Sequence, residues 1–413
     1  MADAALSKAL KAKALNWHKI TCFRAYRLTS ARDAKTQPVL RLNYKCGTDE
    51  RPVYLPNGDQ ASWLIPPCVR AVPLRIGSDD LLIEALDPWA SFKTFIRSRL
   101  TFKRKKYLRF DGFRLLLDSP KATRNLSFET NKLLGRTGTR PDSATALLHP
   151  ELLIGWGPDA VVLPPCTHPA PLPVRIAIVI HIYYVETWPE IAVMLKALPY
   201  QHDLIITLPP EREALTAEIL SDIPSAIIRI VENRGRDVRP FLVLLEDGTL
   251  ARYDYICKIH SKRSRANDPS GNLGDICRRR MFFDLLVAPE AITTILQRFA
   301  ADTTLGMIGS RVFRLRGSKT LSMFWRHNRF NMQNIIRELG GNPERVEPDF
   351  FEGTMFWVRT RAFDKLRDLR LSSRFLHEQG VKDGALEHAI ERIFATSVTL
   401  AGYHIEDTDA LRP

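Results

Sequence analysis

Several features that define large classes of protein are missing from this chain. Its 413 residues contain only six cysteines, and no two of them have CxxC spacing. This argues against a small disulfide framework or a zinc site and fits reduced thiols. No run of about 18 uninterrupted apolar residues occurs, so we expect no membrane-spanning helix. The first residues, MADAALSKALKAKALNWHKI, lack the apolar centre of a secretory signal, and we therefore expect a cytoplasmic protein.

Motifs of several enzyme and nucleic-acid-binding families are missing as well. We find no GxSxG, HExxH or Walker motif, which argues against the hydrolases, zinc proteases and P-loop enzymes that depend on them. No RNP, helix-turn-helix or zinc-finger pattern occurs, so a nucleic-acid partner is not expected and would rest on charge alone. No repeat is visible at a period of about 20 to 50 residues, which argues against a solenoid.

The composition is that of a folded protein. Apolar residues make up 45% of the chain and charged residues 26%, which are ordinary values for globular domains and argue against disorder. A chain of 413 residues is too long for one ordinary core. We therefore expect two domains of roughly 150 to 250 residues each.

The positive charge is concentrated in the first part of the chain. Of the net charge of +14, residues 1–170 contribute +12, from 27 lysines and arginines against 15 acidic residues. The densest segment is Ser91 to Phe110, SFKTFIRSRLTFKRKKYLRF, in which Phe92, Phe95 and Ile96 recur near helical spacing. Such a segment can contact an anionic membrane surface or phosphates, or it can be a solvated basic face. A peripheral contact with the inner face of the cell membrane is the partner that we retain.

The pattern of the chain divides it into three parts. Residues 1–120 are expected to form a basic, mostly β accessory domain, because short segments such as PVLRLNYK alternate apolar and polar residues. Residues 121–172 are irregular and end in VVLPPCTHPAPLPV, whose prolines indicate a linker. Residues 173–413 alternate strands and helices and are expected to form the catalytic α/β domain.

The α/β domain begins with a βαβαβ pattern. VRIAIVIHIYY, HDLIITLPP and SAIIRIVEN are apolar, β-branched segments, and between them TWPEIAVMLKAL and EREALTAEIL have helical spacing. Thr187 is the candidate N-cap of the first helix, with Pro189 in its first turn. The pattern predicts a doubly wound sheet with right-handed crossovers. Ligands of such sheets bind beyond the carboxyl ends of the strands, so residues at those ends come first as site candidates.

One strand end carries the segment VENRGRDVRPFL. Asn233 can bond its own backbone in a tight turn, and Gly235 allows a positive φ or a close approach of a ligand. Asp237 is expected to open the next helix, at the positive end of its dipole. The arginines of the segment, Arg236 among them, could receive a diphosphate. The alternative is a turn with a capping aspartate and exposed arginines.

A second strand end, in YDYICKIHSKRS, is crowded with cations. Lys258, His260 and Lys262 follow or interrupt apolar positions, and such a group is suited to an anion, although it could also solvate the sheet edge. With the end of the first strand, these two segments give the predicted donor-binding residues: His181, Tyr183, Asn233, Gly235, Arg236, Asp237, Lys258, His260 and Lys262.

Four segments in this order, ENRGRDVRPFL, YDYICKIHSKRS, FFEGTMFWVRTRAF and KDGALEHAIERIF, resemble the rhamnan synthesis protein F family. The resemblance covers roughly residues 174–407 and not the N-terminal domain. It implies a GT-A-like glycosyltransferase fold that takes a nucleotide-activated deoxysugar, with dTDP-rhamnose as the expected donor. It implies a growing polysaccharide or lipopolysaccharide as the product, and a glycan or lipid-linked glycan as the acceptor.

The resemblance also bears on metals. GT-A enzymes commonly place an Asp-x-Asp pair after the fourth strand to hold a divalent metal, whereas KIHSK fills that place here. Lysines and a histidine would repel Mg²⁺ or Mn²⁺. We therefore expect no metal and no other cofactor, with Lys258, His260 and Lys262, or some of them, stabilising the leaving nucleoside diphosphate.

An inverting transfer also needs a base for the acceptor hydroxyl. By analogy with the Glu-Asp dipeptide before the last helix of many inverting GT-A enzymes, Asp383 is the first candidate and Glu352 the second. Asp383 could instead be a helix N-cap, and the aromatic strand after Glu352 could be ordinary core. A protein that binds sugar nucleotides without transferring them remains the alternative function. The predicted acceptor-binding residues are Gly353, Thr354, Trp357 and His388.

Overall fold

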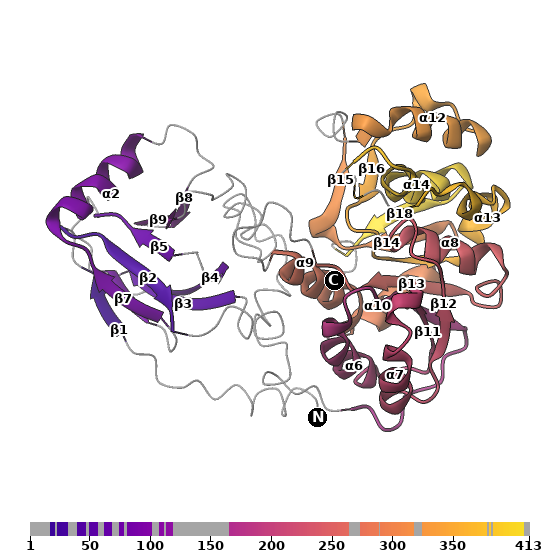
Figure 1. The fold of residues 1–413 in the computed structure, drawn as a ribbon, viewed down its shortest axis with the longest axis horizontal. Coiled ribbons are helices and arrows are strands. Elements are labelled where there is room, and N and C mark those ends of the chain that lie inside the picture. Colours follow the sequence, from indigo (N-terminus) through magenta and orange to yellow (C-terminus); the bar gives the residue numbers. More distant parts are fainter. Residues whose placement is uncertain are drawn as a thin grey trace. The chain divides into compact units, whose positions relative to one another are not determined.

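The fold is that of a computed structural model of the 413-residue chain. It describes residues 17–20, 23–31, 39–46, 49–56, 62–67, 74–77, 81–100, 107–110, 113–118, 165–263, 273–288, 290–317, 324–377, 380 and 383–408. The chain divides into two compact units, Met1–Val161 with Arg263–Arg280, and Val162–Lys262 with Met281–Pro413 (Figure 1). No sequence signal indicated that the short segment after Lys262 groups with the first unit. Most of the predicted linker lies outside the described residues, so its bounds stay a prediction.

The first unit contains two antiparallel sheets, which confirms the prediction of a strand-rich N-terminal part. One sheet has the order β1 (Trp17–Ile20), β6 (Leu74–Gly77), β3 (Val39–Cys46), β4 (Asp49–Pro56). The other has the order β7 (Leu81–Ala85), β2 (Tyr26–Ser30), β5 (Ser62–Ile65), β9 (Phe113–Asp118), β8 (Tyr107–Phe110). A small core of Ala25, Leu64, Leu86 and Leu116 belongs to the second sheet and the turn that follows β7.

The basic segment Ser91 to Phe110 does not form one element. Its first part belongs to helix α2 (Pro88–Leu100), which follows β7, and its last four residues form strand β8, which pairs with β9. The lysines and arginine at 103–106 lie outside the described residues. A single amphipathic face along the whole segment, as its spacing suggested, is therefore not present.

The second unit is built on one mixed sheet of seven strands, shown in Figure 1. Its order is β12 (Ile227–Ile230), β11 (Asp203–Leu208), β10 (Ile176–His181), β13 (Tyr255–His260), β17 (Phe356–Arg359), β14 (Leu305–Gly309), β18 (His404–Asp407). The first four strands are parallel, which confirms the predicted doubly wound start. Strand β17 is antiparallel to both of its neighbours, and β14 and β18 are parallel to each other.

Helices cover both faces of this sheet because its strands alternate buried side chains to both sides. Ala177 and Val179 of β10 belong to one cluster with the buried faces of four helices. These helices are α8 (Val238–Glu246), α12 (Arg329–Glu338), α13 (Asp364–Asp368) and α14 (Leu386–Leu400). Ile178 and Ile180 are also buried but point the other way. Figure 1 shows α6 (Trp188–Lys196), α7 (Leu215–Asp222) and α10 (Ala291–Ala301) on that opposite side.

The remaining described elements are short. Helix α9 (Leu273–Phe282) continues into a π-helical turn, Phe283–Val287, and β15 (Arg314–Arg316) pairs with β16 (Asp349–Phe351). Thr187 stands at the N-cap position of α6 as predicted, but its hydroxyl donates to the Tyr184 carbonyl and does not cap the helix.

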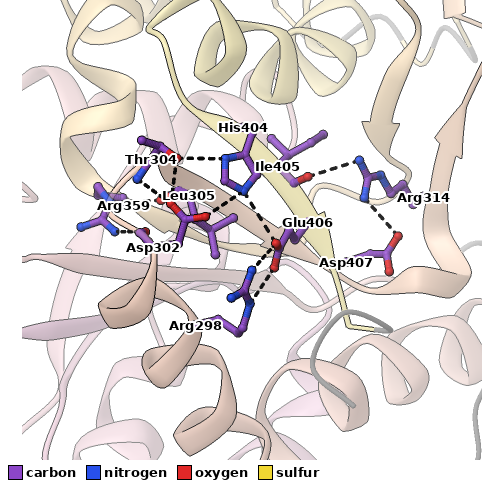
Figure 2. Close-up of polar contacts among 10 residues, drawn as sticks. All are labelled: Arg298, Asp302, Thr304, Leu305, Arg314, Arg359, His404, Ile405, Glu406 and Asp407. Atoms are coloured by element: carbon purple, nitrogen blue, oxygen red, sulfur yellow. Dashed lines mark hydrogen bonds and ion pairs between the residues drawn. The ribbon is translucent and has the colours of Figure 1, made fainter. Parts of the chain in front are cut away.

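Polar contacts hold the last strand at the edge of the sheet, as Figure 2 shows. Arg298 of α10 bonds Glu406 with two nitrogens. Arg314 donates to Asp407 at 3.1 Å and to the Ile405 carbonyl. An edge strand has a neighbouring strand on one side only. These side chains supply hydrogen bonds and ion pairs to β18 in addition to its pairing with β14.

Candidate functional site

The two central parallel strands meet at the point where the strand order reverses. In sequence order the parallel strands run third, second, first, fourth, so the reversal lies between β10 and β13. Their last residues, His181 and His260, are register partners. Just beyond them, Ser261 Oγ accepts the backbone N–H groups of Tyr183 and Tyr184, at 2.9 and 3.1 Å. Ligands of doubly wound sheets bind outside the strand ends at such a reversal.

Both histidines at this point are largely shielded from solvent: His181 is 7% exposed, and the His260 side chain is 12% exposed. His181 Nδ1 lies 3.0 Å from the Thr207 hydroxyl, and His260 Nε2 donates to the Gly353 carbonyl at 2.8 Å. Burial lowers the pKa of each ring to about 4, although the nearby Asp237 carboxylate opposes the shift. Both imidazoles are therefore neutral near pH 7, so His260 brings no positive charge to a diphosphate.

The loop after β12 has an unusual backbone. Gly235 has φ +62°, and a Cβ there would meet Phe375 at 2.2 Å. Arg236 also has a positive φ, 55°, which is uncommon outside glycine and marks a conformation held by its surroundings. The Asn233 side chain donates to Glu211 and does not close the turn on its own backbone. Both the positive φ and the close packing against Phe375 therefore favour glycine at position 235.

A buried ion pair joins the start of α8 to β13. Lys258 Nζ lies 2.7 Å from Asp237 Oδ2, and 2% and 15% of the two side chains are exposed. The ammonium also donates to the carbonyl and hydroxyl oxygens of Thr354, at 2.9 and 3.1 Å. The Thr354 hydroxyl in turn donates to Asp237 Oδ2. Since an ammonium has three N–H donors, all three of Lys258 are engaged.

The surroundings of this pair are aromatic. The rings of Phe241, Phe356 and Phe394 lie 5.7, 6.0 and 5.9 Å from Lys258 Nζ. Burial lowers the pKa of Lys258, and Asp237 opposes the shift. A direct contact of Lys258 with a donor phosphate would break this network. The geometry therefore supports a positioning role for Lys258 in place of the phosphate contact that the sequence suggested.

Asp237 occupies the predicted place at the start of α8 but does not cap the helix with its side chain. Burial alone would raise the pKa of this carboxyl. His260, which is protonated at low pH, acts with the Lys258 ammonium and the Thr354 hydroxyl. Together they outweigh that effect and hold the pKa of Asp237 well below its usual range. The ion pair therefore persists at neutral pH. The Asp237 side chain bonds Lys258 and Thr354 and does not cap α8.

The loop before β17 is held by the same network. Gly353 has φ +86°, donates its N–H to Glu391 at 2.8 Å and accepts from His260. Thr354 has φ +52°, a rare conformation for a β-branched residue. Lys262 lies above this loop, since a Cβ on Gly353 would stand 3.2 Å from its Nζ. Strained backbone of this kind is typical of ligand sites.

A pocket of about 500 Å³ opens beside the Gly235 loop, within the range of roughly 300 to 1,000 Å³ of small-molecule sites. Asp383, before the start of α14, and Glu387, in its first turn, line it together with Gly235. Arg236 Nε lies 3.9 Å from Glu387, so this loop and the start of α14 border one pocket. The remaining lining residues are Asn331, Asn334, Ile335, Glu338, Arg374, Leu376, His377, Gly384, Ala385 and Leu386.

Asp383 is held firmly at the pocket wall. Asn328 donates to its Oδ1 at 2.7 Å, and Arg392 lies 3.7 Å away. Oδ2 has no hydrogen-bond partner among the described residues. Burial raises the pKa of this carboxyl, but Asn328 and Arg392 outweigh it and the pKa is lowered, so the group is ionised at neutral pH. Ala385, and not Asp383, stands at the N-cap of α14, which removes the capping alternative.

The other predicted acceptor residues differ in accessibility. His388 is 7% exposed, and its Nδ1 accepts the Ala385 N–H, so its Nε2 carries the ring proton when neutral. That Nε2 has no partner among the described residues. Trp357 is fully buried and donates to the Leu285 carbonyl, which favours the core interpretation over a sugar platform. Glu352 lies half-buried next to Gly353.

Several residues of the site escaped the sequence analysis because their partners are distant in the chain. Asn328, Glu391 and Ser261 act through contacts with residues far away in the chain, and such pairs have no short spacing. One signal was present: a lysine between Cys257 and Ile259 in a continuous apolar strand has to be buried and therefore paired. Among the described residues, no group of three histidine, cysteine or acidic side chains is placed to hold a metal ion.

Comparisons with known proteins give one family and two relatives. A family model described as rhamnan synthesis protein F matches residues 162–403. Two relatives, each described as uncharacterized protein WxcX, come from two strains of Xanthomonas campestris pv. campestris. Each is 31% identical over 175 residues, which is 42% of this chain and 24% of the relative. The match thus spans about a quarter of the length of these relatives.

The two buried histidines predict a pH dependence of stability. They bind protons when unfolded, with a pKa of 6.5, but when folded only near pH 4. Their contribution is complete above pH 6.5 and is lost as the pH falls toward 4. The free energy of unfolding should fall by up to about 1.4 kcal/mol per pH unit for each histidine. Urea unfolding at several pH values measures this slope, and a His181→Gln, His260→Gln chain that keeps the full slope would contradict the assignment.

The buried ion pair predicts strong coupling between its partners. Lys258→Met leaves the Asp237 carboxylate buried without its cation, and we expect a loss of about 3–5 kcal/mol in the free energy of unfolding. Asp237→Asn should cost a similar amount, whereas the double variant should lose much less than the sum of both. Chemical unfolding of the four chains gives the coupling energy. Additive losses would show that the pair does not act as a unit.

Proposed function

The chain belongs to the rhamnan synthesis protein F family, and from this premise we propose that its second unit is a glycosyltransferase. The donor is a nucleotide-activated deoxysugar, with dTDP-rhamnose as the first candidate. The acceptor is a glycan or lipid-linked glycan at the inner face of the cell membrane. The observation that carries the proposal is the pocket in which the ionised Asp383 shares a wall with Gly235 of the loop that follows β12.

The donor is proposed to lie at the reversal of the strand order, as in other doubly wound sheets. The mixed seven-stranded sheet is compatible with a GT-A-like fold. Tyr183 is partly exposed there and offers a ring for the nucleobase. The diphosphate would then meet Arg236, whose side chain is 44% exposed, and Lys262 above the Gly353 loop. The fixed position of both loops supports this, since charge that is already in place stabilises a leaving group best.

The acceptor is proposed to enter the pocket beside α14. Its hydroxyl oxygen attacks the anomeric carbon, the bond from that carbon to the diphosphate oxygen breaks, and the electron pair leaves with the nucleoside diphosphate. The hydroxyl proton passes to the Asp383 carboxylate, which is ionised and has one oxygen without a partner among the described residues. Attack on the face opposite the leaving group gives inversion. The Nε2–H of His388 can orient the acceptor.

The positioning residues are proposed to act through the loop before β17. Lys258 and Asp237 hold Thr354, and His260 and Glu391 hold Gly353. These contacts fix the loop that carries Glu352 and underlies Lys262. Glu352 is the second candidate for the base, because it stands on the same loop.

Removal of the proposed base should abolish transfer without unfolding the chain. Asp383→Asn should lower kcat by roughly 10² to 10⁴-fold, the usual contribution of a general base, and change KM for the donor little. Release of nucleoside diphosphate from dTDP-rhamnose in the presence of an acceptor glycan measures this. Asp364→Asn, an exposed aspartate of α13, is the matched control and should keep wild-type turnover.

Three results would change this assignment. Near-normal turnover of Asp383→Asn with loss in Glu352→Gln would move the base to Glu352. Near-normal turnover of both would reject a carboxylate base. Nucleotide sugars that raise the Tm of the wild-type chain without any release of nucleoside diphosphate would identify a binding protein instead of an enzyme.

The proposed use of protein cations in place of a metal has its own test. Turnover in an excess of chelator should equal turnover in its absence, because the charge of the diphosphate is then balanced by Arg236 and Lys262. Lys262→Ala should lower kcat in both conditions, whereas Lys19→Ala, at an exposed lysine of the first unit, should not. Loss of activity in chelator that Mg²⁺ or Mn²⁺ restores would contradict metal independence.

A further inference from the structure

Helix α2 of the first unit buries small polar side chains and exposes large aromatic ones, the reverse of an ordinary amphipathic helix. Its inward positions are Ser91, Thr94 and Ser98, which are 2%, 5% and 4% exposed. Its outward positions include Trp89 and Phe92, which are 63% and 53% exposed. Surface helices normally bury their large apolar side chains and expose the polar ones, so the outward face of α2 has an unusual composition.

Hydrogen bonds account for this orientation. Ser91 Oγ accepts the N–H of Ala25 at 3.0 Å and donates to the Leu86 carbonyl. The hydroxyls of Thr94 and Ser98 donate to carbonyls one turn earlier in the helix, a common way to satisfy such groups. Every inward hydroxyl thus has a partner. Ser91 ties the helix to the residues that flank β2 and β7, and Trp89 and Phe92 remain on the outside.

The exposed rings form a patch. Trp89 and Phe92 are stacked, with ring centroids 5.8 Å apart. Phe23 is 89% exposed and precedes by two residues Ala25, the partner of Ser91, so chain reach keeps it near the same end of the helix. Neighbouring exposed aromatic side chains on a soluble unit usually mark an interaction surface.

Cations accompany these rings on the same side of the helix. Lys93 Nζ lies 5.1 Å from the centre of the Trp89 ring, and Arg97 is exposed one turn further along. The chain then continues through the basic residues 103–106, within a part of the sequence that has a net charge of +12 over residues 1–170. Aromatic rings at the level of lipid headgroups, with lysine and arginine beside them, are the usual composition of segments that bind anionic membranes.

We propose that this outer face of α2, formed by Trp89, Phe92, Lys93 and Arg97, binds the surface of an anionic membrane. The rings enter the headgroup region and the cations contact lipid phosphates. A glycan platform fits less well, because a sugar needs a bare ring face and Lys93 and Phe92 already lie against Trp89. Within the part of the chain that the structure describes, no helix has the length and apolar character needed to cross a bilayer. The proposal does not depend on the chemistry of the second unit.

Sedimentation of the full chain with vesicles tests this proposal. We expect binding to vesicles of phosphatidylcholine with phosphatidylglycerol and little binding to phosphatidylcholine alone. Lys93→Ala, Arg97→Ala should weaken binding roughly 30-fold at low salt, and the effect should shrink as salt is added. Trp89→Ser, Phe92→Ser should weaken it at least about tenfold, because the buried apolar area is lost.

Matched controls separate this face from general charge and apolar character. Lys19→Ala, Arg75→Ala removes two exposed cations from strands of the first unit, and Phe330→Ser removes an exposed ring from the second. Both controls should bind vesicles like the wild type. Lipids brominated near the headgroup should quench part of the tryptophan fluorescence, and Trp89→Phe should remove that part.

Two results would overturn the proposal. The first is equal binding of the α2 variants and the controls, or no binding of the wild type to anionic vesicles. The second is a change from dimer to monomer in gel filtration that Trp89→Ser, Phe92→Ser causes while vesicle binding is unaffected, which would assign the face to a second copy of the chain. Far-UV circular dichroism of each variant confirms that the fold is retained, as expected for exposed positions.

Discussion

The site depends on one buried charge pair. Lys258 pairs with Asp237, and the rings of Phe241, Phe356 and Phe394 lie close to the Lys258 ammonium. Removing either partner would leave a charge there without its counter-ion, which is strongly destabilising. The contacts of this pair with Thr354 force a β-branched residue into a positive φ. The same aspartate opens α8 directly after the loop of Gly235 and Arg236. One interaction thus sets the relative position of two strained loops that border the proposed donor and acceptor sites.

The basic residues at these strand ends do not all have the same role. Lys258 is used within the protein, and His260 is neutral because burial lowers its pKa. Arg236 lies on the loop directly before Asp237, and Lys262 follows β13 and lies close to Gly353. Basic residues close together in the sequence can therefore either hold the fold from inside or lie at the surface. Their burial in the structure distinguishes the two.

The sequence was informative where local physics decides the outcome. The alternation after residue 173 predicted the strands and helices of the doubly wound half, and Gly235 was expected to need a positive φ, as it does. It could not show that β17 lies antiparallel between β13 and β14, since strand pairing is a long-range property. It also gave no sign that hydroxyl groups bonded to the backbone occupy the inner face of α2. The bond from Asn328 to Asp383 had no local signal at all.

The separation in sequence of the network's members bears on the order in which the molecule is made. Asp237 and Thr354 lie 117 positions apart, and Phe394 of the aromatic shell belongs to the last helix. During synthesis, the early strands can pair as soon as they emerge, because their contacts are near in sequence. Lys258 must stay charged and hydrated until residue 394 has left the ribosome. Nascent chains that stop short of α14 would therefore expose the apolar residues of the sheet that this helix covers. Such exposed apolar surface is a target for chaperones and proteases.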